Sequence, residues 1–246
     1  MAHPTAGASR KWASPRDNPL VIVRRARELL RQEGLTGLLS GTGRYLGWVL
    51  QWLYTDELLR VYHLSVAEAA AMRVTPPGDN VQVYVIESRE DAMRLSEEGF
   101  ESVLEAVPGA ERRLRCGAVA ACAFLGRELA SIDWMALSER AKPAVDSFPY
   151  RADFASSDAC TGGAYTMPHL RGKGLAAYRF SAQVAYLYAK GRRTCYNAIA
   201  VDNIPSQRTV ERYGATFDAV FRHRRFMGRD SFRQVWSRAK SAGPQT

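Results

Sequence analysis

Two glycines and two cations lie together in the run Arg171-Gly172-Lys173-Gly174. Because glycine has no Cβ, it lets the backbone approach a ligand closely and adopt turns that other residues avoid. A helix that begins directly after such a loop presents free backbone N–H groups, and the positive end of its dipole, to an anion. The run therefore has the residue types needed to bind a pyrophosphate, with Arg171 and Lys173 adding positive charge.

The elements around this run are expected to place it at the end of a strand. Residues 158–166 predict a strand, and Pro168 predicts a turn after it. The residues from Leu175 to about Lys190 predict a helix that ends at Gly191. The order strand, glycine loop, helix is typical of phosphate-binding loops in α/β proteins.

A second segment, Asn203-Ile204-Pro205-Ser206, follows downstream and precedes Gly214 and Phe217. Together, the two segments resemble motifs of the GNAT superfamily of acetyl-CoA-dependent N-acyltransferases, whose loop reads R/Q-x-x-G-x-G/A. The resemblance covers about residues 81–233 and is strongest over residues 164–217.

The resemblance implies an α/β protein with the GNAT acyltransferase fold, a mixed β-sheet flanked by helices. The sheet would be splayed where strand 158–166 parts from strand 194–201. Acetyl-CoA would be the co-substrate, with its pyrophosphate on the loop amides and its pantetheine arm along the end of the first of these strands. The residues that the resemblance assigns to acetyl-CoA are Thr166, Met167, Arg171, Gly172, Lys173, Gly174, Leu175, Ala176 and Asn203.

The implied reaction is direct transfer of the acetyl group from the thioester to a primary amine. Such a reaction needs a hydrogen-bond donor for the developing oxyanion, an acceptor for the amine proton and a proton for the leaving thiolate. A backbone N–H at Thr166 or Met167 would polarise the thioester carbonyl.

The sequence departs from the family pattern at both proton-transfer positions. Val210 stands where many members have a tyrosine, seven residues after the asparagine, and Cys160 stands where a glutamate often lies. Ser206 or water is then the candidate proton donor. Asp158, on the same strand face as Cys160 because it is two residues away, is the candidate proton acceptor, and Asp133 is the next.

Each of these side chains also has a purely structural interpretation. Asn203 and Ser206 are residue types that begin helices and turns. Asp158 could be a solvated carboxylate at a strand end. Tyr213 lies one helical turn beyond Val210 on the same face, so it could donate the proton in place of Val210, or, next to Gly214, it could serve only in packing.

Composition narrows the class of protein. The chain has 246 residues, of which 46% are apolar, and its four cysteines show no C-x-x-C pairing. This argues against a zinc site and a disulfide scaffold, and suits a reducing compartment. Residues 1–18 lack the apolar core of a secretory signal, and the apolar run 45–54 is too short to span a bilayer. We expect a cytoplasmic protein and no bound metal.

The net charge of +9 is compatible with nucleic acid, an anionic membrane or an anionic ligand such as CoA. The sequence contains no nucleic-acid-binding motif, so we expect no nucleic-acid partner. A group of arginines is expected on the last strands: Arg222, Arg224, Arg225, Arg229 and Arg233.

The chain is expected to have four parts. They are a disordered N-terminus (1–18), an N-terminal helical extension (19–78), the acetyltransferase domain (79–238), which follows Pro76-Pro77-Gly78, and a loose tail (239–246). The aromatic residues within 45–54 have two interpretations. They pack a helix on the main domain or a second subunit, or they form an interfacial helix that gives peripheral membrane contact at the inner face through residues 19–60. The oligomeric state is left open.

The acceptor amine is expected to meet the irregular segment 139–157. An amino sugar or nucleotide-linked amino sugar of envelope polysaccharide is the first expectation, and a protein N-terminus is the second. The alternative is a non-catalytic acyl-CoA-binding module of the same fold, because Val210 and Cys160 cannot perform the usual proton transfers.

Overall fold

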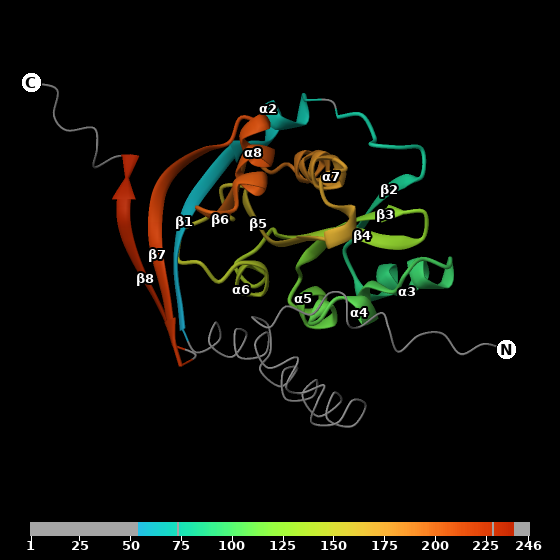
Figure 1. Ribbon diagram of the computed structural model, residues 1–246, viewed down its shortest axis with the longest axis horizontal. Coiled ribbons are helices and arrows are strands. Elements are labelled where there is room, and N and C mark those ends of the chain that lie inside the picture. Colours follow the sequence, from blue (N-terminus) through green and yellow to red (C-terminus); the bar gives the residue numbers. More distant parts are fainter. Residues whose placement is uncertain (1–53, 73, 228, 239–246) are drawn as a thin grey trace, which may run out of the picture.

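The computed structural model describes residues 54–72, 74–227 and 229–238, which build one mixed eight-stranded sheet with helices on both faces (Figure 1). The strands lie in the order β2-β3-β4-β5-β6-β1-β7-β8. Their bounds are β1 (Tyr54–Ser65), β2 (Val81–Ile86), β3 (Val119–Leu125), β4 (Glu128–Ala136), β5 (Asp158–Thr166), β6 (Thr194–Ala200), β7 (Thr216–Phe226) and β8 (Arg229–Ser237). The fold class expected from the sequence, a mixed sheet flanked by helices, is confirmed.

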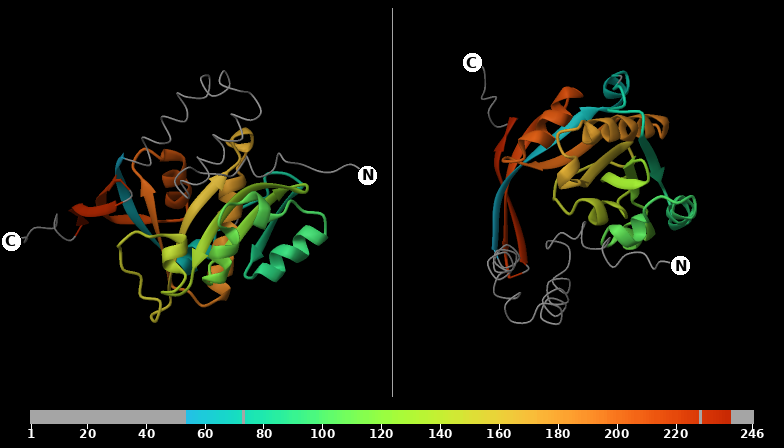
Figure 2. Two further views of the ribbon diagram at one scale, coloured as in Figure 1. Left: turned by 90° about the horizontal axis from the view of Figure 1, so that it is seen from below. Right: turned by 45° about the vertical axis from the view of Figure 1, so that its right-hand side comes forward.

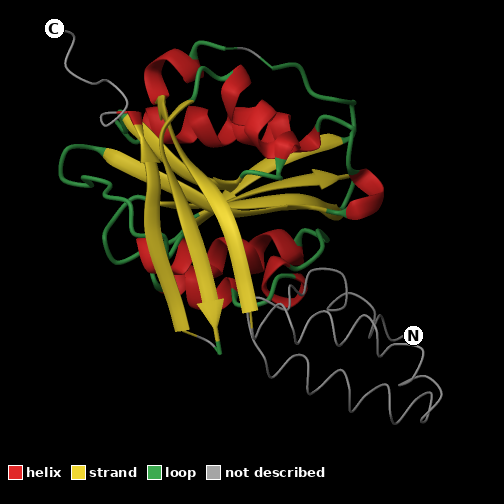
Figure 3. Ribbon diagram, turned by 60° about the vertical axis from the view of Figure 1, so that its left-hand side comes forward, coloured by secondary structure: helices red, strands yellow, loops and turns green. Residues whose placement is uncertain are grey.

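The helices form two layers. One face carries α2 (Val66–Ala70), α7 (Leu175–Ala189) and α8 (Ile204–Arg212). The other face carries α3 (Arg89–Glu97), α4 (Val103–Ala106), α5 (Ala110–Arg115) and α6 (Lys142–Val145) (Figure 3). β3 and β4 are buried almost throughout, since helices cover them on both sides.

The sheet forks between β5 and β6, as the resemblance implies. These two strands are parallel and share four residue pairs, from Asp158↔Thr194 to Thr161↔Asn197. Beyond Thr161, β5 continues along β4, whereas β6 continues along β1. We call the point after Thr161 and Asn197 the fork. Gly163 has φ +74° and lies at a register shift between β4 and β5, so the strand bends here.

β1 corrects the expected domain boundary. Residues 54–65 were expected in a helical extension, but they form a strand between β6 and β7, with seven residue pairs to β6. Its charges pair across the sheet: Asp56 with Arg222 and Arg224, and Glu57 with His223. Residues 1–53 and 239–246, with most of the predicted extension and the proposed membrane contact, lie outside the described residues.

Other elements agree with the sequence to different degrees. The strand 158–166 and the helix from Leu175 are confirmed. α3 and α4 are separate helices, because the chain turns between them at Gly99, whose φ is +89°. β3 begins at Val119, after the short helix α5. The five arginines do lie on the last strands.

β1, β7 and β8 run steeply across the direction of β2, β3 and β4 (Figure 3), and Figure 2 shows them on the opposite side of the molecule from α3. Within the described ranges, none of the helices has the length and apolar character needed to span a bilayer.

His223 joins these three strands. Its Nδ1 lies 3.0 Å from Glu57 Oε1 of β1, and its Nε2 lies 2.7 Å from Asp230 Oδ1 of β8. Hydrogen bonds to Glu57 and Asp230 raise the pKa of His223 above its ordinary value of 6.5, although partial burial opposes them. Because the pKa is raised in the folded state, the stabilisation is fully present below the unfolded pKa and is lost as the pH rises through the folded one.

We therefore expect His223→Gln to lower the melting temperature by about 2–4 °C below about pH 6, the change that about 1 kcal/mol produces in a protein of this size. The difference from the native chain should shrink as the pH rises through the raised pKa of His223. Thermal unfolding across this range measures it, with the more exposed His169→Gln as the control. A pH-independent difference would exclude a charged imidazole.

Candidate functional site

The glycine loop is open to a ligand. A short 3₁₀ turn (Pro168–Leu170) follows β5, and residues 171–174 after it are all exposed. Gly172 and Gly174 both have φ +76°. A Cβ on Gly172 would meet no atom within 4 Å, and one on Gly174 would meet only Pro77 Cβ, at 3.5 Å. The four loop residues 171–174 are therefore open to a ligand in the described part of the chain.

α7 begins at this loop without a side-chain cap. Gly174 is its N-cap, and no side-chain hydrogen bond caps the helix. Leu175 is buried and anchors the first turn, whereas Ala176 is half-buried. An uncapped N-terminus of a fifteen-residue helix offers amide donors and a favourable dipole to an anion.

Arg171 holds the turn as well as adding charge. Its Nε donates to the carbonyl oxygen of Thr166 at 3.1 Å, and its guanidinium lies 5.7 Å from the centre of the Tyr165 ring. These two contacts of Arg171 link the loop to the end of β5. Lys173 is exposed and lies between the two glycines.

A buried polar network links α7 and β4 to the end of β5, where the loop begins. Arg179 of α7 forms an ion pair with Asp133 of β4, with 3.0 Å between Nη1 and Oδ2, and its Nε donates to Ser131 Oγ at 3.1 Å. Ser131 Oγ in turn lies 2.9 Å from Thr166 Oγ1. Asp133 is therefore engaged inside the protein and is not available as a proton acceptor for a substrate.

The edge of β5 beyond the fork is accessible. Gly163 and Ala164 are exposed, and Tyr165 and Thr166 are half-buried. Met167 differs from the expectation, because it is 3% exposed and its N–H donates to the carbonyl oxygen of Ala130. An N–H already bonded within the protein is not free to polarise a thioester, so Met167 does not suit the role that the resemblance implies for it.

Asn203 and Ser206 lie across the fork, at the end of β6. Asn203 Oδ1 accepts from the backbone N–H of Ser206 at 3.3 Å, so Asn203 caps α8. Gln207, which the sequence did not single out, fixes this helix: its Nε2 donates to the carbonyl oxygens of Ala200 and Val201, both at 2.8 Å. A polar residue one turn after a helix cap is common in sequences, so this role of Gln207 cannot be identified from the sequence.

Two predicted proton-transfer residues lie away from the fork. Asp158 begins β5, at the closed end of the β5–β6 pair, and its Oδ2 accepts from the backbone N–H of Asp153 at 2.7 Å. This position favours a role in the preceding turn over a role as base, and its burial excludes the solvated alternative. Tyr213 is buried, and its hydroxyl donates to the carbonyl oxygen of Ala177 at 3.0 Å, as packing predicts.

A different polar group does reach the fork. The segment 139–157 brings Asp146 and Tyr150 against β5 and β6, with the Tyr150 ring stacked on Tyr196 at 5.7 Å between centroids. Sequence reasoning assigned this segment to the acceptor but named no residue within it, because its contacts with β5 are not visible from spacing.

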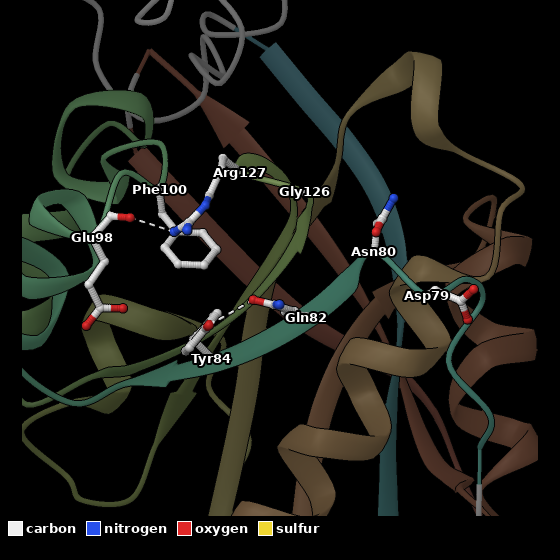
Figure 4. A pocket seen from close by; sticks show the side chains of 8 residues that line it. All are labelled: Asp79, Asn80, Gln82, Tyr84, Glu98, Phe100, Gly126 and Arg127. Carbon is white, nitrogen blue, oxygen red and sulfur yellow. Dashed lines mark hydrogen bonds between the residues drawn. The ribbon is translucent and has the colours of Figure 1, made fainter.

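A cavity of about 510 Å³ opens elsewhere, beside the edge strand β2 (Figure 4). Its polar groups bond to one another: Arg127 Nη1 donates to the carbonyl oxygen of Glu98 at 2.6 Å, and Tyr84 donates to Gln82 Oε1 at 2.8 Å. None of the residues that line it belongs to the predicted site, and we assign it no role.

Comparison with known proteins gives only distant likenesses. No protein-family model and no curated protein matches the chain. Among solved structures, it is similar to a Drosophila protein, with 15% identity, a TM-score of 0.46 and 78% of this chain covered. It is also similar to a putative GNAT-family acetyltransferase from Novosphingobium aromaticivorans, with 18% identity, a TM-score of 0.41 and 68% of this chain covered. A GCN5-related N-acetyltransferase from Kribbella flavida has 14% identity, a TM-score of 0.39 and 72% of this chain covered.

This chain spans 58%, 62% and 60% of those three chains, respectively. Likenesses at these identities and TM-scores carry no function across. The assignment of a function therefore depends on the geometry of the loop and the fork.

Proposed function

We propose that the protein is an acetyl-CoA-dependent N-acetyltransferase that transfers an acetyl group directly to a primary amine. One observation carries this proposal. An open loop, with both glycines in the left-handed region, leads into an uncapped helix N-terminus at the end of the strand that parts from β6. An anion-binding loop beside a fork suits a ligand that has a diphosphate at one end and a reactive group at the other.

In this arrangement, the amides of residues 172–176 bind the diphosphate of acetyl-CoA, and Lys173 adds a cation. The pantetheine arm lies along the exposed part of β5, residues 163–166, and the acetyl group reaches the fork. A backbone N–H of this part of β5 donates to the developing oxyanion. Asn203 and Ser206 contact the arm from the other side, and Ser206 or water protonates the thiolate.

An amino sugar or nucleotide-linked amino sugar is the first acceptor to test, and a protein N-terminus is the second. The competing function is an acyl-CoA-binding module without turnover. It is favoured by Val210, which is buried and cannot donate a proton, and by Cys160, which stands where the family often has a carboxylate.

The test measures binding and turnover separately. Calorimetry with CoA should detect binding by the purified full chain, and incubation with acetyl-CoA and a panel of amines should release free thiol. Glucosamine, a uridine-diphosphate amino sugar and a short peptide with a free N-terminus cover the two acceptor classes. Binding without thiol release across the panel would favour the binding module, and no binding at all would overturn both functions.

A further inference from the structure

Tyr150 lies across the base of the fork. It stacks on Tyr196 of β6, with an angle of 28° between the rings, and the Cys160 thiol of β5 lies within hydrogen-bonding reach of its hydroxyl. Cys160 and Tyr196 are themselves paired across the two strands, one residue before the last pair. The Tyr150 hydroxyl is therefore held where β5 and β6 begin to separate.

Asp146 completes this group. Its Oδ2 accepts from the Tyr150 hydroxyl at 2.8 Å, and its Oδ1 accepts from the backbone N–H of Phe148 at 2.9 Å. A Cβ on Gly162 would lie 3.3 Å from Asp146 Cβ and 2.8 Å from the carbonyl oxygen of Val145. Gly162 is the first residue of β5 past the fork, so Asp146 packs directly against the strand that would hold the acyl arm.

The electrostatics suit a proton acceptor. Burial raises the pKa of the Asp146 carboxyl above its ordinary value, although hydrogen bonds from Phe148 and Tyr150 and the nearby Lys142 ammonium lower it. Burial, together with the charge of Asp146, raises the pKa of Tyr150 well above its ordinary value, so this phenol stays protonated. Burial also raises the pKa of the Cys160 thiol to about 11, which excludes Cys160 as the base at neutral pH.

Lys142 keeps the group in place. Its ammonium donates to the carbonyl oxygens of Asp146 and Phe148 and lies 4.3 Å from the centre of the Tyr150 ring. The segment that carries Asp146 is thus fixed from α6, and the geometry of the carboxylate does not depend on a bound substrate.

We propose that Asp146 is the proton acceptor for the attacking amine, with Tyr150 as the relay between them. The inference rests on the proposed function and supplies the base that Cys160 cannot provide. The amine nitrogen forms a bond to the thioester carbon as the C–S bond breaks, and the electron pair leaves on sulfur. The amine proton passes to the Tyr150 oxygen while the Tyr150 proton passes to Asp146, and the thiolate takes a proton from solvent. The products are the amide and free CoA.

The decisive variant is Asp146→Asn, which keeps an oxygen for the Phe148 N–H but cannot accept a proton. With the amine that the native chain uses, we expect kcat to fall by about 100-fold or more. The Kd for CoA should change by less than about twofold, because no part of the diphosphate site is altered. The melting temperature should hold or rise at neutral pH, since a carboxyl with a raised pKa destabilises the folded state there.

The pH profile separates catalysis from structure. Native kcat should fall as the pH drops through the raised pKa of Asp146, and Asp146→Asn should lack this acid limb. The titratable groups that act on Asp146 and could shift this limb are Lys142, Tyr150 and Cys160. Two more lie one contact away: Glu139 acts on Cys160, and Tyr196 stacks on Tyr150. Tyr150→Phe should lower kcat while leaving CoA binding intact, and Asp146→Glu should restore part of the activity.

Asp153→Asn is the matched control. It removes one carboxylate from the same segment, but Asp153 is exposed and bonds to Ser156, away from the fork. Unchanged kcat in Asp146→Asn would overturn the proposal. A variant with lower kcat, a lower melting temperature and the same acid limb as the native chain would also overturn it, because its loss of activity would then be structural. Failure of the native chain to bind CoA would instead overturn the proposed function.

Discussion

Gly174→Val is expected to weaken CoA binding by at least about 100-fold, or about 2.7 kcal/mol. Gly174 has φ +76°, a conformation that a β-branched residue rarely adopts, and its Cβ would face Pro77. The first turn of α7 must then reorient, and the amides that bind the diphosphate leave their positions. Calorimetry with CoA measures the loss, and the melting temperature shows whether the fold persists.

Gly191→Val is the matched control, because it carries similar backbone strain at the other end of the same helix. Gly191 has φ +69°, and a Cβ there would meet no atom within 4 Å. It should cost stability but leave the Kd for CoA unchanged. Equal Kd values for the two variants and the native chain would exclude the loop as the diphosphate site.

Asp133→Ala is expected to lower the free energy of unfolding by about 3–5 kcal/mol. The side chains of Arg179 and Asp133 are 4% and 2% exposed, so the substitution leaves a cation inside the protein without its counter-ion. Arg179 also holds Ser131, which contacts Thr166 at the end of β5, so the loss should loosen the loop as well. Denaturation in urea measures the effect.

The double variant Asp133→Leu/Arg179→Met tests the cause. Apolar residues of similar volume remove the desolvated charges together, so this variant should recover most of the stability that Asp133→Ala loses. A cost of less than about 1 kcal/mol for Asp133→Ala would mean that the Arg179 charge is solvated, contrary to the burial described above.

The loop and its helix could be predicted from the sequence because their signals are local. Gly172 and Gly174 mark the turn before α7, and Gly191 marks the end of this helix. The fork followed from the motif resemblance rather than from the residues themselves. Strand 158–166 was also visible locally, since its neighbours in the chain are turn-forming residues.

The proton-transfer residues could not be predicted in the same way. Asp158 shares a strand face with Cys160, which makes it a candidate base, but spacing does not reveal that the backbone N–H of Asp153 donates to its carboxylate. Asp146 cannot be identified from the sequence, because its contact with Gly162 depends on how a polar segment folds back over β5. β1 was not predicted for a related reason: its neighbouring strands, and ion-pair partners such as Arg222, lie more than 100 residues away in the sequence.

The position of β1 sets an order on how the chain can assemble. This strand leaves the ribosome before any other part of the sheet described here, yet both of its neighbours, β6 and β7, are made more than 100 residues later. Until then, its backbone groups have no strand to pair with, and pairings at such long range form slowly. The newly made protein therefore carries β1 unpaired through most of its synthesis, and β6 gains its second neighbour only when β1 pairs with it.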